Sequence, residues 1–117
     1  MKETIMILGA DGYLGWPLSI ELGKENDGLV IGVDNFTRRK CVEEVGGESL
    51  TPIQSMETRI KAYEETYKKN NLVFEEGDIT TPGRIGFLLK KYKPTIIINY
   101  AGFSITFIKI NITYKFN

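Results

Sequence analysis

The sequence contains no histidine and a single cysteine, Cys41. Histidine is the commonest general base and metal ligand near neutral pH. One cysteine can neither close an internal disulfide nor supply the thiolates of a zinc site. Without a histidine partner, Cys41 is better explained as an incidental thiol than as a nucleophile. We therefore expect neither metal chemistry nor thiol chemistry in this protein.

The sequence also lacks an excess of charge of either sign, because fifteen basic residues balance fifteen acidic ones. No run of Lys and Arg with interleaved aromatics is present, so a nucleic-acid partner is not expected. No charged-then-apolar leader and no long apolar segment is present either, so we expect a cytoplasmic protein without a membrane partner. A chain of 117 residues, 42% of them hydrophobic, is enough for one domain with a buried core.

The most informative stretch is residues 4–15, TIMILGADGYLG. Its apolar run Thr4–Leu8 shows no polar alternation, which is typical of a strand covered on both faces of a parallel sheet. Gly9, Gly12 and Gly15 follow at every third residue, where they permit a tight turn, close approach of a ligand and packing of a helix on the strand. The helix that begins here would present free N–H groups to a diphosphate.

A second βα unit follows at the expected distance. The pattern predicts a helix over 13–24, a turn at Asn26-Asp27-Gly28 and a buried strand over 29–33. Asp34 then lies nineteen residues beyond Gly15, where a dinucleotide fold places a carboxylate that binds the adenosine ribose. A carboxylate there favours NAD over NADP, although Arg38 and Arg39 could pair with a 2′-phosphate. The alternative role for Asp34 is to cap its own turn.

The remaining pattern completes half of a doubly wound sheet. Residues 37–54 lose all periodicity and are predicted to form a functional loop or insertion. A helix is expected over 56–69, with a strand over 72–76 whose charged end suggests an outer position. Asp78 and Ile79 would then border the adenine, unless Asp78 merely caps its loop.

A third helix is expected to be capped by Thr81, with Pro82 at its first position, and to end at Pro94. The buried strand 95–99 follows, and its small-residue exit, which contains Ala101, would pass beneath the nicotinamide. The predicted fold class is α/β, with a Rossmann-like parallel sheet of order 3-2-1-4, helices on both faces, and truncation after the fourth strand. Residues 1–102 would form a partial NAD-binding domain.

The tail over residues 103–117, FSITFIKINITYKFN, contains no Gly, Pro, Asp or Glu. Its apolar positions change phase after residue 107, so no single strand face is maintained. A/T-rich codons specify these amino acids, which makes an out-of-frame extension the leading explanation and a fifth strand the alternative. With its low charge and high β-propensity, the tail is expected to self-associate, which would give a homo-oligomer.

Several motifs resemble a known family, the extended short-chain dehydrogenase/reductases of the NAD-dependent epimerase/dehydratase type, which act on nucleotide sugars. The segments GADGYLGW (9–16), VDNFTRR (33–39), GGESLTPI (46–53), Arg59-Ile60 and GDI (77–79) carry the resemblance. The loop segment with RR and ESLTPI narrows it to the sulfoquinovose synthases within that family. The similarity covers residues 4–102.

The resemblance implies bound NAD and a reaction that converts UDP-glucose and sulfite to UDP-sulfoquinovose in the intact enzyme. It also implies which residues surround the cofactor. The pyrophosphate would contact Gly9, Gly12, Tyr13, Leu14 and Gly15. Asp34 and Asn35 would bind the adenosine ribose, and Phe36 and Thr37 would line that site. Asp78 and Ile79 would contact the adenine, and Ala101 would lie beneath the nicotinamide.

The sequence departs from the family at its catalytic Tyr-x-x-x-Lys, because none of the six tyrosines has a lysine four residues later. No catalytic residue is therefore assigned, and the chain alone is expected to be inactive, with its UDP-sugar pocket missing. A non-catalytic NAD-binding module, a self-associating remnant and a piece of another nucleotide-sugar epimerase or dehydratase stay open as alternatives. Whether a truncation is natural, and whether a second chain completes the site, are also left open.

Overall fold

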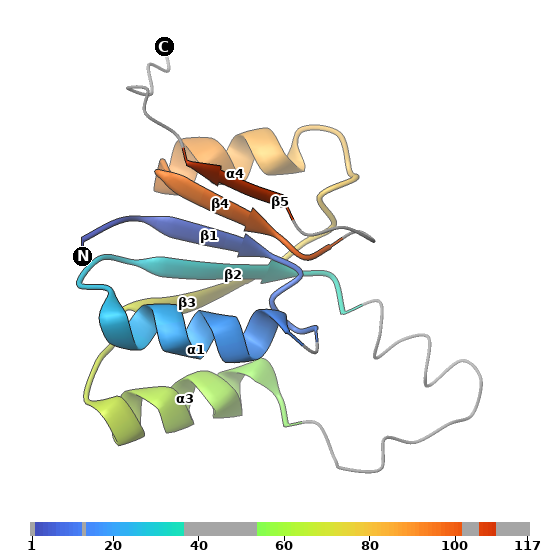
Figure 1. The fold of residues 1–117 in the computed structure, drawn as a ribbon. Coiled ribbons are helices and arrows are strands. Elements are labelled where there is room, and N and C mark those ends of the chain that lie inside the picture. The colour runs from blue at the N-terminus through green and yellow to red at the C-terminus, as the bar shows by residue number, and fades with distance from the viewer. Residues whose placement is uncertain (1, 13, 37–53, 102–105, 110–117) are drawn as a thin grey trace, which may run out of the picture.

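A five-stranded sheet of order β3-β2-β1-β4-β5 runs through the molecule (Figure 1). The computed structural model describes residues 2–12, 14–36, 54–101 and 106–109, the last range as backbone only. Along the chain the elements are β1 (Ile5–Leu8), α1 (Gly15–Glu25), β2 (Val30–Asp34), α3 (Met56–Tyr67), β3 (Leu72–Glu76), α4 (Arg84–Tyr92), β4 (Ile96–Asn99) and β5 (Thr106–Lys109).

The first four strands are parallel and confirm the predicted order 3-2-1-4. Leu8 at the end of β1 lies opposite Val33 on one side and Asn99 on the other. The register therefore brings the carboxyl ends of the strands to one edge of the sheet, where ligands bind in folds of this kind. The outer position predicted for β3 is also confirmed.

The strand β5 continues the sheet beyond β4. It runs antiparallel to β4, with Thr106 opposite Asn99 and Lys109 opposite Ile96. This short strand lies in the tail and spans the point where the apolar pattern changes phase, so the interpretation of the tail as a strand holds for these four residues. The rest of residues 103–117 lies outside the described ranges.

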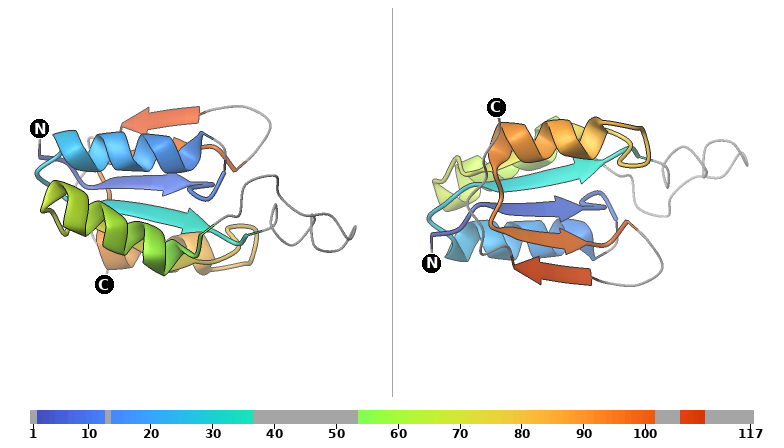
Figure 2. Two further views of the ribbon diagram at one scale, coloured as in Figure 1. Left: turned by 90° about the horizontal axis from the view of Figure 1, so that it is seen from below. Right: turned by 90° about the horizontal axis from the view of Figure 1, so that it is seen from above.

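Two apolar clusters, one on each face of the sheet, form the core. Side chains alternate along β1, so that Ile5 and Ile7 join the cluster that α1 and α3 cover. Met6 and Leu8 join the cluster on the other face, which Leu88 of α4 covers. Every residue of β1 is buried, which explains why its sequence shows no polar alternation. Figure 2 shows α1 and α4 on opposite faces of the sheet. Helices on both faces were expected and are confirmed.

The helix boundaries differ from the expected ones by a few residues: α1 begins at Gly15 instead of residue 13, and α3 begins at Met56 as expected but ends at Tyr67 instead of residue 69. Ser55 caps α3 by accepting a hydrogen bond from the Thr58 N–H at 3.2 Å. The predicted cap of α4 at Thr81 with Pro82 in the first turn is wrong, because the helix begins at Arg84 after a left-handed Gly83 with φ of 83°. Glycine reaches that φ without strain, so it replaces the side-chain cap.

A set of polar contacts joins the carboxyl end of α1 to the connection between α3 and β3. The Asn71 amide donates to the carbonyls of Gly23, Asn26 and Gly28 at 2.8–3.0 Å, and its own oxygen accepts from the Tyr63 hydroxyl. The Lys69 ammonium donates to three carbonyls of the same region. The last carbonyls of a helix have no partner within the helix, so these side chains supply the missing donors.

Replacement of Asn71 by alanine should lower the free energy of unfolding by about 2 kcal/mol. It removes the donor to the Gly28 carbonyl and the acceptor of the Tyr63 hydroxyl, whereas Lys69 still donates to the Gly23 and Asn26 carbonyls. Urea denaturation followed by circular dichroism measures the change. Asn70→Ala is the matched control, since Asn70 is exposed at the neighbouring position. An equal loss in both variants would contradict this role of Asn71.

Candidate functional site

The glycine turn lies directly beyond β1 and is fixed to the end of β2. Gly9 and Ala10 both donate their N–H groups to the Val33 carbonyl, at 2.8 and 3.1 Å. Gly9 has φ of 84°, a left-handed conformation, and its carbonyl accepts the Gly12 N–H at 3.1 Å. The turn is therefore tight, and two of these three backbone hydrogen bonds fix it to the end of β2.

Two of the glycines cannot be replaced by a larger residue without moving the backbone. A Cβ atom on Gly9 would lie 2.7 Å from the Tyr100 carbonyl carbon, and one on Gly15 would lie 2.2 Å from the Gly9 oxygen. The exit of β4 thus passes against Gly9, and α1 packs against the turn. The contact at Gly15 matches the predicted packing of the helix on the strand, and the contact of Gly9 with the β4 exit was not predicted.

The helix α1 begins at this turn and points its amino end toward the same edge of the sheet. Leu14 occupies the N-cap position, is 51% exposed, and forms no side-chain cap. Within the described part of the chain, the first turn of α1 carries no acidic residue. A helix start without a carboxylate keeps its partial positive charge available to an anion. Within this turn the Trp16 N–H already donates to the Gly12 carbonyl at 3.3 Å, and Pro17 has no N–H. Tyr13, expected beside Leu14, lies outside the described residues.

Asp34 ends β2 and faces the glycine turn. One of its carboxylate oxygens accepts the Asp11 N–H at 2.9 Å, and the other accepts the Phe36 N–H at 2.9 Å. Each carboxylate oxygen has more than one acceptor direction, so the group keeps capacity for ribose hydroxyls. Asp34 therefore caps its own turn, as the alternative interpretation expected, by accepting the Phe36 N–H. Its contact with Asp11 also holds the carboxylate beside the glycine turn.

The residues after Asp34 form the wall of this region. Phe36 has φ of 60°, an uncommon conformation for a bulky residue, and its ring packs on Phe74 with centroids 5.3 Å apart. Asn35 is half-buried beside it. Thr37 and the loop that follows, through residue 53, fall outside the residues that the structure describes.

The turn that follows β3 lies next to β2, because the Gly77 N–H donates to the Asp34 carbonyl at 2.9 Å. One oxygen of Asp78 accepts both the N–H and the hydroxyl of Thr80, at 2.9 and 2.6 Å. The loop-capping interpretation of Asp78 is thus the one that these contacts match. Ile79 packs against the core cluster beneath α4.

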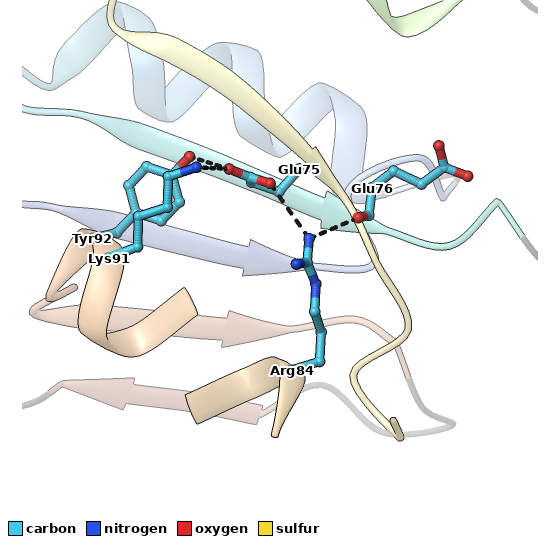
Figure 3. Close-up of polar contacts among 5 residues, drawn as sticks. All are labelled: Glu75, Glu76, Arg84, Lys91 and Tyr92. Atoms are coloured by element: carbon cyan, nitrogen blue, oxygen red, sulfur yellow. Dashed lines mark hydrogen bonds and ion pairs between the residues drawn. The ribbon is translucent and has the colours of Figure 1, made fainter. Parts of the chain in front are cut away.

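A charged network supports this turn from below (Figure 3). The Arg84 guanidinium donates to the Glu76 carbonyl at 2.8 Å and lies 3.4 Å from the Glu75 carboxylate. Lys91 and Tyr92 donate to the other Glu75 oxygen. The hydrogen bond from Lys91, followed by that from Tyr92, lowers the pKa of the Glu75 carboxyl. Burial is the main cause that raises the pKa of Tyr92.

Two residues of the site were not predicted from the sequence. Asp11, within the glycine turn, is only 4% exposed in its side chain, and its carboxylate lies 3.4 Å from the Arg59 guanidinium of α3. That guanidinium lies over the Trp16 ring at 5.3 Å. The position of Arg59 in one of the motifs shared with the nucleotide-sugar enzymes was the available signal, but the motif alone named no partner.

The β4 exit completes the edge. The Ala101 N–H donates to the Asn99 side chain at 2.8 Å, and its nitrogen would lie 2.8 Å from a Cβ atom on Gly9. The structure therefore brings together the glycine turn, Asp34 and Ala101, while Asp78 and Ile79 lie one strand further out. Among the residues with described positions, no cluster of three metal-binding side chains occurs.

The sheet order and the glycine turn between β1 and α1 are those of a Rossmann-like α/β fold. Comparison with known families agrees: the sequence model of the NAD dependent epimerase/dehydratase family matches residues 5–115. The chain belongs to this family. The match includes most of the tail, so its range does not stop at Gly102, although the division into a domain over 1–102 and a separate tail stays a prediction.

Two curated relatives narrow the similarity. The chain is 37% identical over 97 residues to UDP-sulfoquinovose synthase of Sulfolobus acidocaldarius, which covers 83% of this chain and 24% of the relative. It is 31% identical over 100 residues to the chloroplastic UDP-sulfoquinovose synthase of Spinacia oleracea, which covers 86% of this chain and 20% of the relative. The chain thus spans a quarter or less of the length of these relatives. The predicted resemblance to the family is confirmed. No helix in the described ranges has the length and apolarity that a membrane crossing needs.

The lowered pKa of Glu75 predicts a loss of stability in acid. Its contribution is present above the unfolded carboxyl pKa of about 4.5 and is lost as the pH falls through the lower folded value. Glu75→Gln should therefore destabilise the protein at neutral pH, and the difference from wild type should shrink below that range. Urea denaturation at a series of pH values measures it.

Glu76→Gln is the control for this series, because the Glu76 carboxylate points away from the network (Figure 3). It should leave the pH dependence of stability unchanged. A difference between Glu75→Gln and wild type that stays constant down to about pH 2 would contradict the assignment.

Proposed function

We propose that this chain binds NAD across the glycine turn and Asp34, as the amino-terminal cofactor half of a nucleotide-sugar enzyme similar to UDP-sulfoquinovose synthase. The observation that carries the proposal is the close packing of Gly9 and Gly15, where backbone leaves no room for a Cβ atom. A tight glycine turn beside a helix start without a side-chain cap matches the needs of a diphosphate.

The position of Asp34 supports NAD rather than NADP. Two backbone N–H groups hold its carboxylate beside the turn. A carboxylate at this position accepts hydrogen bonds from ribose hydroxyls and repels a 2′-phosphate. Asn35, Phe36, Asp78 and Ile79 would line the adenosine half, with Leu14 and Gly12 at the diphosphate and Ala101 at the nicotinamide. Tyr13 and Thr37 keep the roles that the resemblance implies.

The conversion of UDP-glucose and sulfite to UDP-sulfoquinovose would need groups beyond those in these 117 residues, since no Tyr-x-x-x-Lys occurs in the sequence. A second segment or chain would have to supply the proton acceptor and the UDP-sugar pocket. We therefore propose cofactor binding, and not turnover, as the function of this chain by itself, in the cytoplasm.

Isothermal titration calorimetry with NAD and NADP tests this proposal. The unaltered chain should bind NAD at least roughly tenfold more tightly than NADP, and a hundredfold excess of NAD over its Kd should stabilise the fold by about 2.7 kcal/mol. Asp34→Asn should weaken NAD binding and narrow the preference, because the carboxylate charge is lost.

Asp27→Asn is the matched control for this experiment, since Asp27 is an exposed acid before β2, at the opposite edge of the sheet. It should bind both cofactors as the unaltered chain does. Absence of NAD binding by the unaltered chain, with no shift of its melting temperature at millimolar NAD, would eliminate the proposed function.

Self-association is a second candidate function, favoured by the position of β5. This strand ends the sheet order and is hydrogen-bonded to β4 alone among the described strands. The outer side of such a strand presents backbone donors and acceptors to another chain. A second copy of this chain, paired through β5, would extend the sheet across the two molecules.

Light scattering as a function of concentration tests the second candidate. The unaltered chain should form a dimer or a larger assembly, and Ile108→Lys should shift it toward the monomer, since charge in an edge strand opposes pairing. Phe87→Lys, on exposed Phe87 of α4, is the control for general loss of apolar surface. A monomeric unaltered chain would rule out this candidate.

A further inference from the structure

Asp11 is an anomaly in a turn that is proposed to hold a diphosphate. It lies between Gly9 and Gly12, and its side chain is 4% exposed. A buried carboxylate is costly unless it is paired, and one that stands next to an anion site would also repel the anion. Some feature of the fold must therefore offset the charge of Asp11.

Arg59 provides that offset from a distant part of the sequence. Its guanidinium lies 3.4 Å from the Asp11 carboxylate, although 48 residues separate the two. The Arg59 side chain is 22% exposed, so the pair is largely shielded from solvent and its attraction is only weakly screened. The contact joins α3 directly to the glycine turn.

Trp16 fixes the position of the guanidinium. The Arg59 guanidinium carbon lies 5.3 Å from the centre of the Trp16 ring, within the range of a cation–π contact. Trp16 belongs to the first turn of α1, whose amino end faces the proposed diphosphate. One arginine thus contacts both the acid of the turn and the helix that follows it.

The backbone of Asp11 is held at the same time from the other side, because its N–H donates to the Asp34 carboxylate at 2.9 Å. Displacement of Asp11 would therefore also disturb the group proposed to bind the ribose. The side chain of Asp11 connects to α3 and its backbone connects to β2, so the turn has two independent supports.

We propose that Arg59 is a positioning residue for the cofactor, which holds the glycine turn in place through Asp11 and neutralises the charge that Asp11 brings to the diphosphate site. The inference rests on the proposed NAD binding. It assigns a role in that binding to α3, which lies outside the glycine turn and the adenosine wall.

The test measures the Kd of the full chain for NAD by isothermal titration calorimetry. Arg59→Met should weaken NAD binding roughly tenfold, the size of effect expected for one uncompensated charge near a bound anion. Asp11→Asn should bind NAD at least as tightly as the unaltered chain, because an amide oxygen can still accept the hydrogen bond from Arg59 while the repelling charge is gone. The double variant should recover most of the affinity that Arg59→Met loses, and Arg59→Lys should lose less than Arg59→Met.

Lys24→Met is the matched control. Lys24 also combines an ion pair, with Glu21 at 3.4 Å, and a ring contact, with Tyr67 at 5.0 Å, but it lies at the far end of α1. It should leave the Kd for NAD unchanged. Adenosine, which has no phosphate, separates support of the turn from neutralisation of the Asp11 charge. Loss of the neutralising charge should weaken the binding of NAD more than the binding of adenosine.

Each outcome decides the matter. Equal NAD affinity of Arg59→Met and the unaltered chain would overturn the inference and leave the proposed function intact. If the double variant binds NAD as weakly as Arg59→Met does, the claim that Arg59 offsets the charge of Asp11 is overturned. If Arg59→Met does not fold, weaker NAD binding by Asp11→Asn would overturn the inference and equal or tighter binding would support it. No NAD binding by the unaltered chain would overturn both proposals.

Discussion

The turn between β1 and α1 depends on one carbonyl oxygen, that of Val33, which accepts the N–H groups of both Gly9 and Ala10. This contact fixes the turn to the end of β2 and so sets the distance between the start of α1 and Asp34. The exit of β4 passes against Gly9 on the other side. Strands on both sides therefore define the position of the turn at the carboxyl edge of the sheet, where ligands bind in folds of this kind.

Most of the sheet could be predicted because its signals are local. The continuous apolar run of β1 and the spacing of the next strand depend on burial of both faces, and the structure buries all of β1. The order 3-2-1-4 could be predicted from the glycine turn after the first strand, which is typical of the doubly wound fold that has this order. By contrast, the start of α4 was misplaced, because Thr81 and Pro82 satisfy the usual signals while the left-handed Gly83 begins the helix two residues later.

The candidate site was predictable where it depends on spacing and unpredictable where it depends on partners. Asp34 follows from its distance to Gly15, since both lie on adjacent βα units. Its contact with the Asp11 N–H requires the turn to fold back beside β2, which no local pattern encodes. The role of Asp78 was ambiguous for a similar reason, because an aspartate after a strand can bind a ligand or cap its own loop. In the structure one of its oxygens accepts hydrogen bonds from the N–H and the hydroxyl of Thr80.

Two negative side chains lie around a turn proposed to bind a doubly charged linker, and the fold treats them differently. Asp34 is held in place by two backbone N–H groups, which do not neutralise its charge, so it remains an acceptor. Asp11 is buried and paired with a guanidinium, so its charge is offset. The helix start, which carries no acid in its first turn, then supplies the positive end of the field. This distribution places negative charge where hydroxyl groups would lie and removes it from where phosphates would lie.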